Sequence, residues 1–205
     1  MGKIIAVVNQ KGGVGKTTTA VNLTAALHDL GKKVLLCDFD PQANATSGLG
    51  LEKRKIKHSV YDVTINGTSV EQAIVHTKFG DVLPSSADLA GAGVELIGTD
   101  NRERQLAKAL DRVKDQYDVI FIDCPPSLEI FGVVLTMFDG RTNFSTQVAQ
   151  EVRRHFPGKV FASVVPRNIR LAEAPSHGLP VTAYDRSSRG AVAYKAMAEE
   201  IKAKL

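Results

Sequence analysis

The chain lacks the features of membrane-spanning, secreted and repeat proteins. No apolar run in its 205 residues approaches the ~18 residues that a membrane span requires. The N-terminus has no signal-peptide pattern, because the first apolar strand follows Met1 almost at once. No linker, repeat or low-complexity block divides the sequence. We therefore expect a cytoplasmic protein with one domain over residues 1–205.

Cysteine is also scarce, and both cysteines have a simple structural explanation. Cys37 and Cys124 each lie at the end of an apolar run beside an aspartate. Reduced, buried core residues are the expectation, and a disulfide or metal site is disfavoured. An iron–sulfur reductase related to nitrogenase iron protein would need cysteine pairs for its cluster, so that class is disfavoured too.

The net charge of +4 is unevenly distributed. Positive and negative residues balance over residues 1–125, so the whole excess lies in residues 126–205, where much of it is arginine. The planar guanidinium suits phosphate. A solvated basic surface explains the charge as well as a nucleic-acid surface does. Charge alone leaves both interpretations open.

The most informative segment is KIIAVVNQKGGVGKTT at residues 3–18. An apolar, β-prone run leads into a glycine-rich loop, then a lysine and a threonine, and then a helical pattern. This order is typical of a P-loop, in which bare backbone N–H groups surround phosphate, the lysine reaches the β- and γ-phosphates and the hydroxyl ligates Mg²⁺. The predicted nucleotide contacts are Gly12, Gly13, Val14, Gly15, Lys16, Thr17 and Thr18.

Strand and helix patterns alternate along the rest of the chain. Strands are expected at Lys33–Cys37, Val119–Ile122, Ile130–Met137 and Val160–Val165. Helices are expected at Lys16–Leu30, Val70–His76, Arg102–Lys114, Thr142–His155 and Ser188–Lys204. Alternation of this kind predicts the α/β class: a three-layer P-loop NTPase fold with a mostly parallel sheet and helices on both faces.

Three aspartates follow predicted strands, where ligands of such sheets bind. Asp38 and Asp40 end the second strand, and Asp123 precedes a Pro-Pro turn. Nucleotide hydrolysis needs a carboxylate near Mg²⁺ and a group that orients the attacking water. We assign Asp123 to the Mg²⁺ side and Asp40 to the water. A carboxylate that merely caps a turn is the alternative for each one taken alone.

These segments, with DFDPQANATSGLG at 38–50, DCPPSL at 123–128 and GVVLTMFDGRTN further on, resemble ParA/Soj-type chromosome-partitioning ATPases of the MinD/ParA class. The resemblance covers nearly the whole chain. It implies that Lys11 is a signature lysine reaching the partner's phosphates in an ATP-sandwich homodimer. It also implies catalytic roles for Lys11, Lys16 and Asp40, with Thr17, Asp40 and Asp123 near Mg²⁺.

The resemblance further implies that ATP-bound dimers bind DNA without sequence preference. A centromere-binding ParB/Spo0J-type partner then stimulates hydrolysis to ADP. The candidate DNA contacts are Arg141, Arg167, Arg170 and Arg189. Pro166, Arg167 and Asn168 follow a strand and are also candidates for the adenine pocket, so Arg167 has two competing assignments.

One segment of the family pattern is missing. Only about six residues separate the strand ending near Asp123 from the one starting near Ile130, whereas a parallel crossover needs about a dozen or more. ParA-type chains carry a further strand and helix there, so a unit on the order of 40 residues is expected to be absent near 128–129.

Two alternatives remain beside a DNA-partitioning ATPase. The first is a MinD-type membrane-associated regulator, which needs an amphipathic C-terminal helix. The tail offers Met197, Ile201 and Leu205 but also Glu199 and Glu200, and it is expected to pack on the sheet without forming a membrane anchor. The second is a shortened nucleotide binder without turnover.

Overall fold

The computed structural model describes residues 2–8, 13–90, 105–124, 133–155 and 160–203. Its larger sheet has five strands in the order β1-β5-β2-β4-β3. These strands are β1 (Lys3–Val7), β2 (Val34–Asp38), β3 (Val75–Thr77), β4 (Gly80–Leu83) and β5 (Val119–Asp123). All neighbours run parallel except β3, which is antiparallel to β4. The predicted mostly parallel sheet is confirmed.

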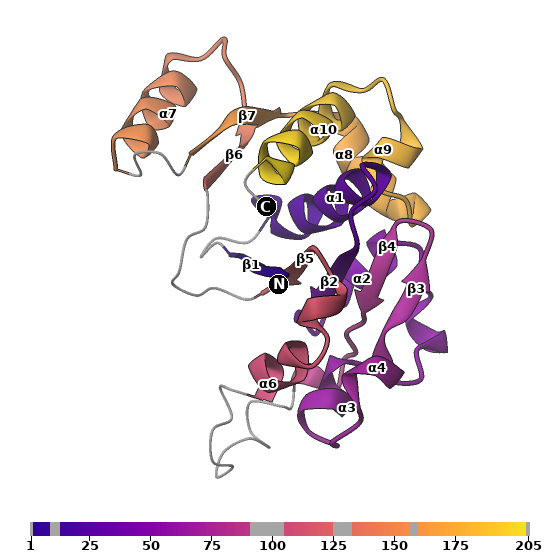
Figure 1. The fold of residues 1–205 in the computed structure, drawn as a ribbon. Coiled ribbons are helices and arrows are strands. Elements are labelled where there is room, and N and C mark those ends of the chain that lie inside the picture. The colour runs from indigo at the N-terminus through magenta and orange to yellow at the C-terminus, as the bar shows by residue number, and fades with distance from the viewer. Residues whose placement is uncertain (1, 9–12, 91–104, 125–132, 156–159, 204–205) are drawn as a thin grey trace.

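Helices cover both faces of this sheet because its strands are apolar on both sides (Figure 1). On one face, Val34 and Leu36 of β2 pack in a cluster with α1 (Lys16–Asp29) and α10 (Arg189–Lys202). On the other face, Leu35 and Cys37 pack with the short helices. Those helices are α3 (Val60–Thr64), α4 (Val70–Ala73) and α6 (Gln105–Asp111). The three-layer arrangement is therefore confirmed.

A second, two-stranded sheet pairs β6 (Val133–Phe138) with β7 (Val160–Pro166) in parallel. Helix α10 packs against β7 and also against α1, and its Met197 and Ile201 are buried. Between the two sheets, β1 pairs only with β5 among the described residues, and its Ile4 is 42% exposed. Among the described residues, no strand pairs with β1 on the side opposite β5, so the two sheets are not joined through β1.

The remaining helices are short or peripheral. They are α2 (Asn44–Gly48), α7 (Asn143–His155), α8 (Ile169–Glu173) and α9 (Val181–Tyr184), with 3₁₀ turns at Lys53–Lys55, Lys114–Gln116 and Ala174–His177. In Figure 1, α7 lies beside β6 and β7, away from the five-stranded sheet. No helix in the described ranges is long and apolar enough to span a bilayer.

Most predicted elements are present with ends shifted by a few residues, but the region after residue 51 differs. The helix predicted for Val70–His76 is wrong beyond Ala73, because β3 begins at Val75. Strand β4 was not predicted at all. The predicted gap near 128–129 and the start of the Ile130–Met137 strand lie outside the described residues, so both stay predictions, as does the single-domain assignment.

Candidate nucleotide-binding site

The described part of the glycine loop leads directly into α1. Gly13 and Gly15 have φ of +71° and +93°, a left-handed backbone that favours glycine. Gly15 is the N-cap of α1 and provides no side-chain cap, and the first turn contains no acidic residue. The positive end of α1 is therefore left for an anion. Lys11 and Gly12 lie outside the described residues, so their roles stay predictions.

Three strand ends meet beside this loop. In the register of the parallel sheet, Asp123 of β5 lies opposite Val7 of β1 on one side and Asp38 of β2 on the other. The backbone N–H of Phe39 donates to the Asp123 carbonyl oxygen over 3.0 Å. The carboxyl ends of the three strands thus place both aspartates in a row with the glycine loop, as the sequence predicted.

Asp123 is buried, with 2% of its surface exposed, and its Oδ2 has no hydrogen-bond partner. Burial raises the pKa of Asp123 to about 6, and the negative charges of Asp38 and Asp40 add to the rise. A hydrogen bond from Thr17 and the positive charge of Lys16 oppose it. A buried, unsatisfied carboxylate oxygen next to a threonine hydroxyl fits the oxygen donors that Mg²⁺ prefers.

The protein would supply only part of the shell of such an ion. Among the described residues, no group of three or more His, Cys, Asp or Glu is arranged to hold a metal. Mg²⁺ usually takes one or two carboxylates and completes its shell with phosphates and water. Cys37 and Cys124 are unbonded thiols, and burial raises the pKa of both. Protonated thiols are poor metal ligands.

Asp38 and Asp40 have different partners. Asp38 is fully buried, and its Oδ2 accepts hydrogen bonds from the Thr46 backbone N–H at 2.8 Å and the Thr46 hydroxyl at 2.7 Å. The Thr46 hydroxyl in turn accepts the Ser85 backbone N–H at 3.0 Å. Asp40 is half-buried and accepts the Gln42 backbone N–H at 2.9 Å. Asp38 therefore holds the loop that carries Asp40.

Two further contacts, which no sequence pattern indicates, tie other elements to the glycine loop and to α1. The Thr136 hydroxyl in β6 donates to the Val14 carbonyl oxygen over 2.8 Å. Asn22 of α1 accepts the Val181 backbone N–H over 2.6 Å, which joins α1 to α9. The roles of Thr46 and Ser85 were also not predicted, although Thr46 falls inside the DFDPQANAT stretch.

The candidates for the adenine pocket lie at the end of β7. Pro166 is the last residue of the strand, and Arg167 is exposed. Asn168 is the N-cap of α8, and its Oδ1 accepts the Arg170 backbone N–H at 2.9 Å. The structure thus gives Asn168 a helix-capping role in addition to the predicted contact with adenine, which stays a prediction.

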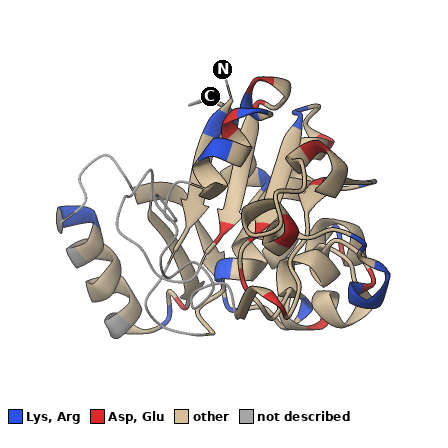
Figure 2. Ribbon diagram, turned by 90° about the horizontal axis from the view of Figure 1, so that it is seen from below, with Lys and Arg blue, Asp and Glu red and all other residues tan. Residues whose placement is uncertain are grey.

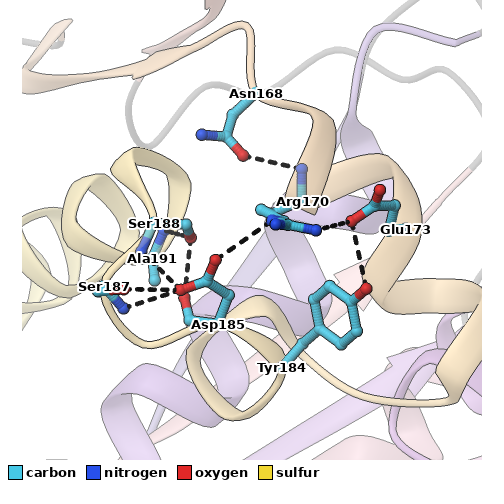
Figure 3. A network of polar contacts seen from close by, with 8 residues as sticks. All are labelled: Asn168, Arg170, Glu173, Tyr184, Asp185, Ser187, Ser188 and Ala191. Atoms are coloured by element: carbon cyan, nitrogen blue, oxygen red, sulfur yellow. Dashed lines mark hydrogen bonds and ion pairs between the residues drawn. The ribbon is translucent and has the colours of Figure 1, made fainter.

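The four arginines proposed for DNA are all exposed, but two of them form ion pairs. Arg141 forms a bidentate ion pair with Asp139. Arg170 forms ion pairs with both Glu173 and Asp185 (Figure 3). Lys and Arg are interspersed with Asp and Glu over the ribbon (Figure 2). The described helical arginines of the C-terminal third lie on three different helices, Arg153 and Arg154 on α7, Arg170 on α8 and Arg189 on α10.

Comparison with known proteins identifies the family. Residues 2–140 match a family described as an AAA domain. The chain is 45% identical to the sporulation initiation inhibitor protein Soj of Bacillus subtilis, with 99% of each chain covered. It is 41% identical to the chromosome-partitioning ATPase Soj of Treponema pallidum, covering 100% of this chain and 98% of the relative.

A solved structure supports the fold. The septum site-determining protein MinD from Pyrococcus horikoshii, complexed with Mg-ADP, is 28% identical and superimposes with a TM-score of 0.81, covering 98% of this chain and 96% of the other. The alignment with the Bacillus subtilis relative runs over 251 residues, which exceeds the 205 residues of this chain. The relative therefore contains residues without a counterpart here. By sequence and fold together, this chain belongs to the ParA/Soj family of chromosome-partitioning P-loop ATPases.

Proposed function

We propose that this chain hydrolyses ATP to ADP with Mg²⁺ and drives the segregation of a chromosome or plasmid. The observation that supports this most is the row formed by the glycine loop, Asp123 and Asp38 at adjacent strand ends. The MinD structure that shares this fold holds Mg-ADP. The start of α1 would bind the phosphates, and the aspartates would supply the carboxylates that hydrolysis requires.

Each residue of the site has a defined role in this proposal. The backbone of Gly13–Gly15 and the start of α1 bind the phosphates, and Lys16 pairs with their charge. Thr17 and Asp123 would hold Mg²⁺, which when bound neutralises charge on the phosphate oxygens. Asp40 orients the attacking water, and Asp38 keeps the Asp40 loop in place through Thr46.

In this proposal the protein switches between a monomer and a DNA-bound dimer. Binding of ATP assembles a homodimer in which Lys11 of each subunit contacts the other's nucleotide, and the dimer binds DNA without sequence preference. A ParB/Spo0J-type partner stimulates hydrolysis and release. The protein would then be cytoplasmic and associated with the nucleoid. Burial of Met197 and Ile201 leaves these side chains to the core rather than to a membrane.

The test measures phosphate release and retention on nonspecific duplex DNA, each with ATP and Mg²⁺. We expect turnover and ATP-dependent retention that weakens steeply with salt, because phosphate contacts release counterions. Lys16→Ala should abolish both, while Lys108→Ala in α6 should change neither. DNA retention that is equal without ATP would contradict the switch. Absence of Mg-ATP binding by the folded protein in calorimetry would overturn the whole proposal.

A second candidate function is a nucleotide binder without turnover. The specific observation is that β1, the strand that leads into the glycine loop, pairs with only one strand, β5, among the described residues. Saturable Mg-ATP binding without phosphate release would favour this candidate over the first.

A further inference from the structure

The proposed DNA contacts lie close to carboxylates of the same chain. Asp139 follows β6 and feels the positive charges of both Arg141 and Arg189, the latter being the first residue of α10. Arg170 pairs with Asp185, only four positions before Arg189 in the sequence. Three of the four candidate arginines therefore have an acidic neighbour: Asp139 for Arg141 and Arg189, and Glu173 and Asp185 for Arg170.

The ion pairs use guanidinium donors that a phosphate could also use. Arg141 donates from Nε to Asp139 Oδ1 at 2.9 Å and from Nη2 to Oδ2 at 2.8 Å. Arg170 donates from Nη1 to Glu173 Oε2 at 2.7 Å, and its Nε lies 3.3 Å from Asp185 Oδ2. Carboxylate and phosphate both accept the planar fork of a guanidinium, so each pair occupies a phosphate-binding geometry.

Stability does not explain these pairs. The Arg141 side chain is 90% exposed and that of Arg170 is 47% exposed. Ion pairs in water contribute little to folding because solvent screens them and ordering the side chains costs entropy. The Arg141–Asp139 pair is nevertheless well formed, with two hydrogen bonds of 2.9 and 2.8 Å, and it lowers the pKa of Asp139. What the pairs change directly is which guanidinium donors stay open to another anion.

We propose that Asp139 and Glu173 are built-in competitors of DNA phosphate at Arg141 and Arg170. The inference rests on the proposed function, in which these arginines contact DNA. A phosphate that takes the paired donors must displace or share the carboxylate, and the adjacent negative charge opposes binding at the remaining donors, so the pairs weaken DNA binding and ease its release. The phosphate backbone is the ligand class, because the competition involves charge and fork geometry and no base-specific contact.

Glu173 and Asp185 differ in how they are held. Asp185 Oδ1 accepts the backbone N–H groups of Ser187 and Ser188 and the Ser187 hydroxyl, which fixes it in the turn before α10 (Figure 3). Glu173 has one further partner, the Tyr184 hydroxyl at 3.2 Å. Glu173 is therefore the carboxylate that can move away from Arg170, and Asp185 stays as part of the turn.

The experiment compares Asp139→Asn, Glu173→Gln and their combination by fluorescence anisotropy with a nonspecific duplex, ATP and Mg²⁺. We expect each single change to tighten DNA binding about 3- to 10-fold at low salt, with a gain that shrinks as salt rises. The matched control is Glu52→Gln, which removes the same charge from an exposed pair with Lys55 at 2.8 Å. Melting curves verify that each variant is folded.

Arg141→Ala and Arg170→Ala separate the two proposals. If these changes weaken DNA binding but Asp139→Asn and Glu173→Gln leave it unchanged, the arginines bind DNA and the competition is wrong. If Glu52→Gln tightens binding as much as the other two, net charge explains the gain and the competition is again wrong. If the arginine changes have no effect, the proposed DNA surface fails and this inference fails with it.

Discussion

Thr136 in β6 and Val14 in the glycine loop are joined by a hydrogen bond of 2.8 Å across 122 positions of sequence. The hydroxyl donates to a backbone carbonyl oxygen, so it fixes the loop without using any N–H group that a phosphate would need. This contact links the two-stranded sheet to the nucleotide site. It also makes the small sheet relevant to binding, although no candidate nucleotide ligand lies in β6.

Replacement of Thr136 by valine tests this link. The change keeps the side-chain shape and removes the donor, at a cost of about 1 kcal/mol for a lost hydrogen bond. We expect Mg-ADP affinity to fall about 3- to 10-fold in calorimetry. Thr64→Val is the control, because the Thr64 hydroxyl bonds within α3, to Val60 at 2.8 Å. Equal affinity of the two variants would show that the contact does not act on the loop.

Replacement of Thr46 by valine removes the hydroxyl between Asp38 and Ser85. Both partners are buried, so we expect a loss of about 1–3 kcal/mol in the free energy of unfolding, measured by urea titration. We also expect turnover to fall more than nucleotide affinity, because Asp40 lies in the loop that Thr46 holds. Thr46→Ser should restore most of both. A variant with lower stability but unchanged turnover per folded molecule would contradict the positioning role.

The Asp123 carboxylate should determine the response to magnesium. In the wild type, chelation with EDTA is expected to weaken ADP binding. Asp123→Asn should bind ADP more weakly than wild type with Mg²⁺ present and lose most of the dependence on the metal. Asp115→Asn, an exposed site in the 3₁₀ turn before β5, should behave as wild type. Full retention of the metal response in Asp123→Asn would remove Asp123 from the site.

Gly190 marks a close approach of α10 to α8. A Cβ at this position would lie 2.7 Å from Leu171 Cγ, which is closer than real side chains allow. Alanine normally favours a helix over glycine, but here overpacking should dominate, and Gly190→Ala should destabilise the fold by about 1–3 kcal/mol. Adding Leu171→Ala to Gly190→Ala should recover part of that loss. A Gly190→Ala variant that melts above wild type would disprove the close packing.

Tyr194 should make the protein sensitive to alkaline pH. Its hydroxyl bonds the Thr19 hydroxyl at 3.0 Å, and burial raises the pKa of Tyr194 to about 12. In the unfolded chain the Tyr194 hydroxyl ionises near pH 10. Between about pH 10 and 12 the folded state therefore binds more protons than the unfolded state, and the free energy of unfolding falls as the pH rises. Tyr194→Phe should cost about 1 kcal/mol at pH 7 and show a shallower loss above pH 10. Parallel pH profiles would contradict this assignment.

The placement of Asp38 and Asp123 at adjacent strand ends could be predicted from local pattern, while their roles stay predictions. Asp38 and Asp123 end apolar runs, and such runs in a parallel sheet finish at one edge, so their proximity to the glycine loop followed from strand assignment alone. The helix from Lys16 was predicted to end at Gly31, because glycine commonly terminates helices. In the structure Gly31 has a φ of +78°, which agrees with that role.

Contacts that depend on tertiary packing were not predictable. The β3–β4 hairpin was missed because β4 has four residues and its turn is built by Thr77, whose hydroxyl bonds Gly80 and Phe79. The helix ends at Ala73 and the strand begins at Val75, and this short spacing made the two elements look like one helix in the sequence. The carboxylate partners of Arg141 and Arg170 depend on the folded backbone, since charge counts cannot show which residues pair.

The outer side of β1 has a practical consequence for anyone purifying this protein. In the part of the chain that the structure describes, no strand pairs with the outer edge of β1, so another polypeptide can dock there by sheet extension, and the exposed Ile4 would add contact area. Concentrated samples should therefore form aggregates at a rate that grows with the square of the concentration. A charge introduced at Ile4 is the simplest way to keep such preparations monodisperse.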